Sequence, residues 1–163
     1  MSSLFQIRKA RRSDVAAIVA MFGEDEVGHG DQEGGRDLSP YLAGFERIEA
    51  SPDNAVYVAE LDGEVVGTFQ RTLIPGLVAH GRIRLKIESV HVRKDKRGHG
   101  LGKAMMRFAL DEARELGAGI VELTSNKARR DAHRFYERLG FTRSHEGFKL
   151  ILATGTAGVP PAR

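Results

Sequence analysis

Three glycines within five residues give the sequence its clearest chemical feature, in the segment Arg97-Gly98-His99-Gly100-Leu101-Gly102. It follows an alternating apolar stretch that ends at Val92 and opens an amphipathic stretch, so it is predicted to join a strand to a helix. Glycine lets a backbone approach a ligand closely, and the first turn of a helix presents N–H groups that have no partner within the helix. With Lys94, Lys96 and Lys103 nearby, these groups suit a pyrophosphate.

Two common phosphate-binding motifs do not fit this segment. A P-loop needs glycine where the chain has Arg97 and a hydroxyl group where it has Ala104. The dinucleotide-binding motif needs its third glycine one residue later, and it follows the first strand of its fold. The pattern by itself also fits an ordinary glycine-rich turn. Residues 97–103, called the glycine loop below, therefore need other motifs to give them a function.

A change of parity just before the loop predicts a β-bulge. Leu85 and Ile87 occupy odd positions, whereas Val90 and Val92 occupy even ones. A strand alternates with period two, and no turn residue separates the two pairs, so one extra residue is expected near Glu88–Ser89. A bulge bends its strand and interrupts the ladder, often beside an active site.

Three motifs in order resemble the GNAT superfamily of N-acetyltransferases. The segment Arg97-x-x-Gly100-x-Gly102, placed after Val90-His91-Val92, resembles the acetyl-CoA motif of that family. The stretches Leu123–Asn126 and Ala132–Phe141 resemble its second motif, which carries a tyrosine on a short helix before a Gly-Phe pair. The predicted bulge has a family counterpart on the strand where the acetyl-thioester enters. The resemblance covers residues 4–152.

The resemblance implies how the chain would hold acetyl-CoA, its expected acetyl donor. The backbone of Val90–Val92 would pair with the pantetheine arm like an added strand, and the loop N–H groups would hold the pyrophosphate. Asn126 would meet the cofactor near the pantetheine, although it lies six residues before Ala132 where many relatives have three. The implied cofactor-binding residues are Val90, His91, Val92, Arg97, Gly98, His99, Gly100, Leu101, Gly102, Lys103 and Asn126.

Tyr136 is the candidate general acid. In the resembled family the amine attacks the thioester directly, and the absence of Cys is consistent with a mechanism that has no acyl-enzyme. A phenol with an ordinary pKa near 10 can donate a proton to the departing thiolate. The alternative is a tyrosine that packs in the core beside Phe135.

Glu88 is the candidate general base, acting directly or through water. It lies at the predicted bulge, and some members of the family carry a glutamate on this strand. The alternative is a strand carboxylate that pairs with Lys86 or Arg84. His91 and His133 are weaker candidates, because an exposed or hydrogen-bonded structural histidine is more common than a catalytic one.

The rest of the sequence predicts the elements that position these residues. They form an α/β fold with a mixed, mostly antiparallel central sheet of about six to seven strands, a bulged fourth strand and about four flanking helices. Residues 1–152 are expected to form one domain and 153–163 a disordered tail. The expected strands are Leu4–Ala10, Ala55–Leu61, Glu64–Leu73, Arg82–Val92, Ile120–Thr124, Phe141–Arg143 and Phe148–Leu152. The first expected helix begins after Ser13 or Asp14. The other three span Ser39–Ala50, Leu101–Leu116 and Asp131–Leu139.

Composition excludes several classes of function. With 163 residues and no Cys, the chain fits one soluble domain without thiol catalysis, thiolate metal sites or disulfides. The sequence has no apolar signal core, no 18-residue apolar run and no metal-ligand spacing, so we expect a cytoplasmic protein with no membrane partner and no metal. Residues 1–81 hold 7 basic and 13 acidic side chains, whereas 82–163 hold 18 and 9. Cofactor phosphates account for the basic half, and no nucleic-acid motif accompanies it, so nucleic-acid binding is not expected.

The expected acceptor is a primary amine of a small molecule. The acidic segment Glu24–Asp37 is predicted to be a mobile flap that attracts a cationic amine, or simply a solvated loop. Arg71, His80, Arg82 and Arg84 would suit an acceptor that carries phosphonate, phosphate or carboxylate, and the second motif looks similar to aminoalkylphosphonate acetyltransferases. The alternatives are a protein or peptide amine as acceptor, or a non-catalytic domain that senses acetyl-CoA. The sequence is compatible with a homodimer.

Overall fold

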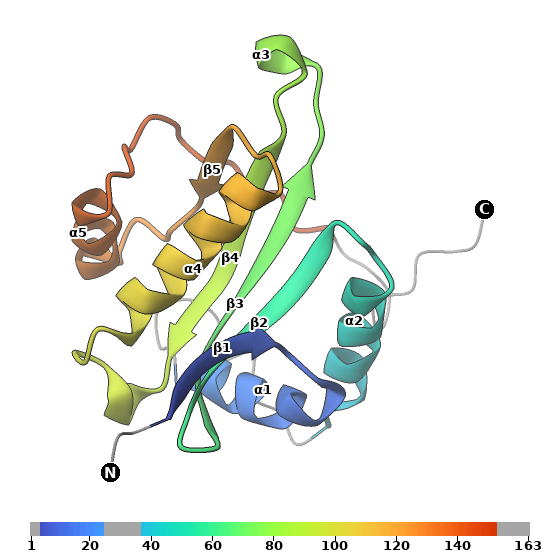
Figure 1. Ribbon diagram of the computed structural model, residues 1–163, viewed down its shortest axis with the longest axis vertical. Helices are drawn as coiled ribbons and strands as arrows, with labels where there is room; N and C mark the ends of the chain where they lie inside the picture. Colours follow the sequence, from blue (N-terminus) through green and yellow to red (C-terminus); the bar gives the residue numbers. More distant parts are fainter. Residues whose placement is uncertain (1–3, 25–36, 153–163) are drawn as a thin grey trace.

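The computed structural model describes residues 4–24 and 37–152. Within them, five strands form one sheet in the order β1-β2-β3-β4-β5 (Figure 1). The first four strands are antiparallel to their neighbours, and β5 is parallel to β4. The strands are β1 (Phe5–Lys9), β2 (Asn54–Leu61), β3 (Glu64–Ile74), β4 (Arg84–Val92) and β5 (Ile120–Leu123).

The prediction of six to seven strands was wrong. Phe141–Arg143 and Phe148–Leu152 contain no strand, and the side chains of Phe148 and Leu150 are 95% and 85% exposed. Apolar residues give a segment a local preference for strand, but a strand exists only where its backbone groups find a partner. These two segments pair with no strand in the part of the chain that the structure describes.

Helices cover both faces of the sheet (Figure 1). The four predicted helices are present, together with the short α3 at the tip of the β3–β4 connection. The helices are α1 (Val15–Gly23), α2 (Ser39–Glu49), α3 (Val78–Gly81), α4 (Leu101–Glu115) and α5 (Arg130–Arg138), with two 3-10 turns, η1 (Arg12–Asp14) and η2 (Lys94–Lys96).

The predicted acidic flap and the predicted disordered tail cannot be compared with the structure. Most of the acidic segment Glu24–Asp37 and the whole tail 153–163 lie outside the described residues. Within residues 4–24 and 37–152, no helix has the length and apolar character that a membrane crossing requires.

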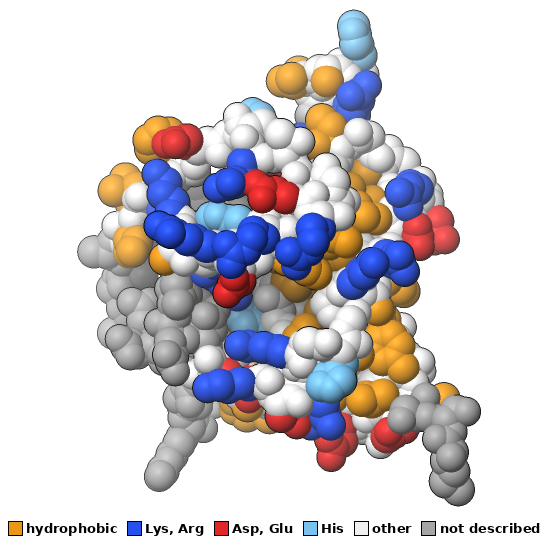
Figure 2. Space-filling view, turned by 90° about the vertical axis from the view of Figure 1, so that its left-hand side faces the viewer, with side chains coloured by type: hydrophobic (Ala, Val, Ile, Leu, Met, Phe, Trp, Pro, Cys, Tyr) orange, Lys and Arg blue, Asp and Glu red, His pale blue; other side chains and the backbone are white. Residues whose placement is uncertain are grey.

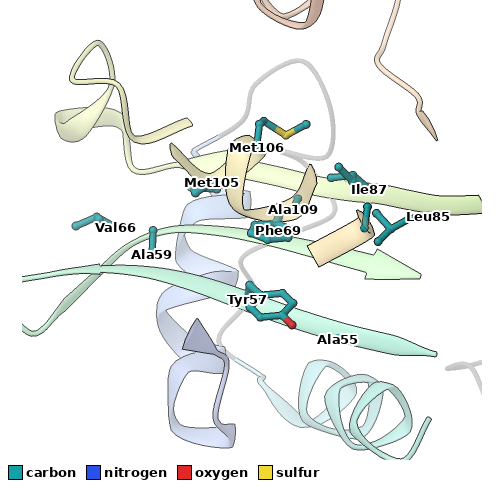
Figure 3. Packing of buried hydrophobic residues seen from close by; sticks show 11 residues of the cluster. Ala55, Tyr57, Ala59, Val66, Phe69, Leu85, Ile87, Met105, Met106 and Ala109 are labelled. Atoms are coloured by element: carbon teal, nitrogen blue, oxygen red, sulfur yellow. The ribbon is translucent and has the colours of Figure 1, made fainter. Parts of the chain in front are cut away.

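The larger core lies between the sheet and α4 (Figure 3). Phe69 of β3 and Leu85 and Ile87 of β4 are at most 1% exposed and pack in one cluster with Met105 of α4. Each such side chain contributes about 1.5–3 kcal/mol through burial. The helix comes so close to β3 that a Cβ atom added at Gly67 would lie 2.6 Å from the sulfur of Met105. Gly67 therefore allows α4 to pack this close to β3.

The opposite face of the sheet carries α1 and α2. Val15, Val19 and Phe45 form one small buried cluster there, and Ile18 and Met21 form another with Val58 of β2. The entrance to α1 is held by Asp14, which is 7% exposed and accepts hydrogen bonds from the Arg8 guanidinium at 2.7 and 3.1 Å and from the Arg11 N–H at 2.7 Å.

The bulge predicted from parity is confirmed. Thr68 pairs with His91 and Gln70 with Glu88, so one residue of β3 stands opposite two residues of β4. Ser89 takes up the extra length with a φ of +52°, an uncommon conformation for a residue other than glycine. As a result Leu85 and Ile87, and then Val90 and Val92, all pack toward the α4 cluster.

Candidate active site

The bulge ends the pairing of β4 with β5. Their parallel ladder runs only from Arg84 to Ile87 of β4. From Glu88 to Val92, β4 pairs with β3 on one side and with no described strand on the other. The backbone predicted to receive a pantetheine arm, Val90–Val92, is therefore a free strand edge, which suits a ligand that binds as an added strand.

The glycine loop opens α4 in the predicted manner. Gly98 and Gly100 have φ values of +81° and +80°, which favour glycine. Gly100 caps the helix, and the Ala104 N–H donates to its carbonyl oxygen at 3.0 Å. The N–H groups of Leu101, Gly102 and Lys103 precede this bond, so the helix does not use them. A row of free N–H groups at a positive helix end fits a pyrophosphate.

Two loop side chains shape the loop. The Arg97 Nε donates to the carbonyl oxygen of Val92 at 3.0 Å. The His99 Nδ1 lies 2.9 Å from the carbonyl oxygen of Arg97. The Arg97 contact ties the loop to the end of β4, and the His99 contact lies within the loop, so the two side chains together restrain the backbone that carries the N–H groups.

Helix α5 meets the start of α4 through Phe135, the residue before Tyr136. A Cβ atom added at Gly102 would lie 3.5 Å from the Phe135 ring and 3.8 Å from Val92, so β4, α4 and α5 meet at this point. The Tyr136 ring packs edge-on against Phe135 and Phe141, with centroid distances of 5.2 and 6.0 Å. Burial raises the pKa of Tyr136 above its ordinary value, which keeps the phenol protonated.

A second cavity of about 650 Å³ lies between the glycine loop and α5. Four arginines line it, Arg97, Arg129, Arg130 and Arg134, and Arg134 also pairs with Asp131. Lys and Arg side chains form a band across this face of the molecule (Figure 2). The positive charge that the sequence carries after residue 81 thus gathers beside the predicted pyrophosphate site. This cluster was not predicted from the sequence, because Arg129, Arg130 and Arg134 lie within a stretch that resembles a family motif and only the fold brings them beside Arg97.

Asn126 and His133 hold the segment before α5. The Asn126 Oδ1 accepts the Ala128 N–H at 2.9 Å, and its carbonyl oxygen lies 2.9 Å from the His133 Nε2. The Asn126 amide oxygen thus takes part in a turn. The contact of Asn126 with the cofactor stays a prediction. His133 has a structural contact that accounts for its place on α5.

Glu88 lies on the α1 and α2 face of the sheet, opposite the α4 core. Its register partner Gln70 shares that face with Val56, and its carboxylate pairs with the Lys86 Nζ at 2.9 Å. The side chain of Glu88 is 40% exposed. The ion pair predicted as the alternative role of Glu88 is therefore formed with Lys86. Glu88 also lies beside the bulge, as predicted.

His91 also lies on this face. Its ring packs at a tilt against Phe22 of α1, with a centroid distance of 4.9 Å, and its Nδ1 lies 3.1 Å from the carbonyl oxygen of Ser89. His91 is only 6% exposed. Its side chain therefore ties α1 to the bulge, while its backbone belongs to the free edge of β4.

The four basic residues predicted to face the acceptor do not come together. Arg71 is 5% exposed on the α4 face, where its guanidinium lies 3.4 Å from the Glu112 carboxylate. Arg84 pairs with Glu122 at 3.1 Å. His80 and Arg82 belong to the tip of the β3–β4 connection and its return. Because side chains alternate along a strand, Arg71 and Arg84 lie on opposite faces of the sheet. The prediction grouped the four residues by their basic character alone.

A smaller cavity of about 220 Å³ lies on the α1 and α2 face, next to the bulge. Gln70 and Ser89 line it together with apolar residues of both helices. Sequence reasoning missed Gln70, because only the register of β3 against β4 brings it beside Glu88.

The comparisons with known proteins agree with this geometry. The model of the acetyltransferase (GNAT) family matches residues 17–141. The chain is 32% identical over 147 residues to the aminoalkylphosphonate N-acetyltransferase of Salmonella typhimurium, across 90% of this chain and 91% of that protein.

Solved structures are similar over almost the whole chain. A transcriptional regulator from Bacillus halodurans is 36% identical and matches with a TM-score of 0.87 over 91% of this chain and 100% of that one. An acetyltransferase from Clostridium acetobutylicum, solved with acetyl-CoA, has a TM-score of 0.70 over 91% and 96% of the two chains. Its identity of 21% makes it evidence for the fold alone.

Proposed function

The chain belongs to the GNAT family of acetyltransferases, which use acetyl-CoA as the acetyl donor, and we propose that it transfers the acetyl group directly to the primary amine of a small molecule. The observation that carries the proposal is the meeting of three features at one point. The free edge of β4 after the bulge, the N–H groups of the glycine loop and helix α5, through Phe135 beside Tyr136, meet around Gly102.

The donor side would be held by backbone groups. The N–H groups of Leu101, Gly102 and Lys103 would bind the pyrophosphate, and the edge of Val90–Val92 would align the pantetheine. Acetyl-CoA supplies a thioester whose carbonyl carbon accepts the amine. Because the loop is fixed by Arg97 and His99, the chain would hold this carbonyl without a large rearrangement.

The acceptor side would need a neutral amine. Glu88 would take a proton from the ammonium group, directly or through water, because it lies beside the bulge on the α1 and α2 face. The nitrogen lone pair then forms the C–N bond as the C–S bond breaks. Tyr136, which burial keeps protonated, would donate its proton to the departing sulfur. The second proton, which the nitrogen loses as the amide forms, would pass through water and restore the Tyr136 phenol.

The small-molecule acceptor rests on the Salmonella relative, whose name states that it acetylates aminoalkylphosphonates. A protein or peptide amine, and a domain that binds acetyl-CoA without turnover, are the competing functions. A cytoplasmic location and a homodimer stay predictions.

A thiol-release assay tests the proposal. Purified protein is incubated with acetyl-CoA and single amines from four classes, namely alkyl and aryl amines, polyamines, amino acids and aminoalkylphosphonates. Calorimetry measures acetyl-CoA affinity in parallel. We expect binding and turnover with at least one class. Binding with no turnover on any amine would favour the sensor or the protein acceptor, and absence of binding would refute the assignment of the glycine loop.

A further inference from the structure

The 220 Å³ cavity beside the bulge is lined by one stripe from each of two helices. Four lining residues of each helix are spaced i, i+3, i+4, i+7. They are Val15, Ile18, Val19 and Phe22 of α1, and Tyr41, Gly44, Phe45 and Ile48 of α2. This spacing places four side chains of each helix on one face. Apart from Tyr41 and Gly44, all of these helix residues carry apolar side chains, so both walls are apolar.

The floor of the cavity is the sheet, and its polar groups gather at one end. Thr68, Gln70 and Ser89 supply them. The Thr68 hydroxyl donates to the Tyr57 carbonyl oxygen at 2.9 Å, so its proton is already engaged. Gln70 and Ser89 flank the register shift, next to the free edge of β4. The polar groups of the floor therefore lie beside the proposed donor site.

Within residues 4–24 and 37–152, the lining of the cavity offers no cation that would neutralise an anion. Among the residues that the structure describes, no Lys, Arg or His lines it. The buried Arg71 lies on the other face with Glu112, and Lys86 pairs with Glu88. A phosphonate or carboxylate placed between these apolar walls would lose its hydration without gaining a cation, which is costly.

The size of the cavity limits the occupant. A cavity of about 150 Å³ with apolar walls holds a benzene ring. The cavity of about 220 Å³ therefore has room for one ring or a short branched alkyl group together with a chain of two carbons.

We propose that the acceptor is a primary amine with a short, uncharged apolar body, of the arylalkyl or alkyl type, which lies between α1 and α2 with its amine at Gln70 and Ser89. The inference rests on the proposed function, which it narrows to one class of acceptor. That class differs from the phosphonates named for the Salmonella relative.

Two commercial amines test this preference as a matched pair. 2-Phenylethylamine and 2-aminoethylphosphonate share an aminoethyl group and differ only in whether the far end is a phenyl ring or an anion. Thiol release with acetyl-CoA is measured for both over a range of concentrations. We expect kcat/KM for the phenyl compound to exceed that for the phosphonate by about tenfold or more, because a hydrophobic pocket discriminates by such factors.

Variants of α2 test the location. Gly44→Leu fills the cavity from its wall, and a Cβ atom at that position would approach only the Arg47 guanidinium, at 4.0 Å. Ile48→Phe fills the cavity from one helical turn further along α2, and it replaces Gly44→Leu in the assay if that variant is unstable. Ala43→Leu adds the same bulk at an exposed position of the same helix and is the matched control. We expect both filling variants to lower kcat/KM for 2-phenylethylamine about tenfold. Acetyl-CoA affinity stays unchanged, and so does turnover by the control.

The outcomes separate this inference from the proposed function. Turnover of the phosphonate in preference to the phenyl compound would overturn the inference and leave the acetyltransferase in place. Equal effects of Gly44→Leu and Ala43→Leu on a stable fold would overturn the location. If acetyl-CoA binds and neither compound nor any other small amine is acetylated, both the inference and the small-molecule function are wrong.

Discussion

A negative charge at Gly102 should weaken acetyl-CoA binding without harming the fold. Gly102 is the second residue of α4, and its N–H is one of those predicted to face the pyrophosphate. Its φ lies outside the left-handed region, and an added Cβ would meet Phe135 at 3.5 Å, which is ordinary van der Waals contact. Gly102→Glu is therefore sterically allowed. An acidic residue in a first helical turn also gains about 0.3–1 kcal/mol from the helix dipole.

The penalty on binding follows from Coulomb's law. A carboxylate at roughly 6 Å from a pyrophosphate of charge about −2 experiences a repulsion of about 2–3 kcal/mol at an effective dielectric constant of about 40–60. Because about 1.4 kcal/mol is a factor of ten, the dissociation constant of acetyl-CoA should rise about 30- to 140-fold.

Gly102→Gln separates charge from bulk. It has the size of glutamate and no charge, so we expect its affinity to stay within about threefold of the parent. Calorimetry with acetyl-CoA measures the three proteins at low and at high salt, and the gap between the two variants should shrink as salt screens the repulsion. Equal affinities for the Glu and Gln variants at low salt would refute the placement of the pyrophosphate at this helix end.

Three further substitutions test the remaining parts of the argument. Tyr136→Phe should lower kcat by about 10²–10⁴-fold with little change in acetyl-CoA affinity, and a loss under about threefold in the thiol-release assay would make Tyr136 a packing residue only. Tyr57 has its pKa raised to about 12 by burial and by its hydrogen bond to Glu112, so it binds its proton more tightly in the folded state. Its contribution to stability is therefore complete below about pH 10 and is lost as the pH rises toward 12, and Tyr57→Phe should flatten that part of the denaturation profile. For Asp14, burial alone would raise the pKa, but hydrogen bonds from Arg8 and the Arg11 N–H lower it, so its contribution is present at neutral pH and is lost below about pH 4. Asp14→Asn should lower the free energy of unfolding by about 2–3 kcal/mol at pH 7 and by less at pH 3, as measured by urea denaturation; equal losses at both pH values would contradict the ion pair.

Features set by local geometry could be predicted from the sequence. The bulge followed from the parity of Leu85, Ile87, Val90 and Val92, because period two allows only one explanation when no turn residue intervenes. The glycine loop followed from glycines that must adopt positive φ where a strand meets a helix, and Gly98 and Gly100 do so. These are properties that a short stretch of chain determines by itself.

Features that depend on partners could not be predicted in this way. The run Phe148–Leu152 has strand-forming residues, but its pairing depends on a neighbouring edge that the sequence does not specify. Arg71 looked like an acceptor contact because the sequence does not reveal which face it occupies. That face follows from its pairing with Ala55 and from the carboxylate that α4 places above it. Gln70 was missed for the same reason.

The bulge explains why two chemically different sites can share one strand. Without the extra residue, Val90 and Val92 would point away from Ile87, and the strand could not present apolar side chains to α4 along its whole length. With it, the α4 side keeps its core up to the glycine loop, and Glu88 and His91 both face α1 and α2. The same residue ends the pairing with β5 and so frees the edge between the two faces. In the proposed function, an amine held on one face would reach a thioester aligned along that edge. The bulge at Ser89, rather than any single side chain, would then be the feature that joins acceptor to donor.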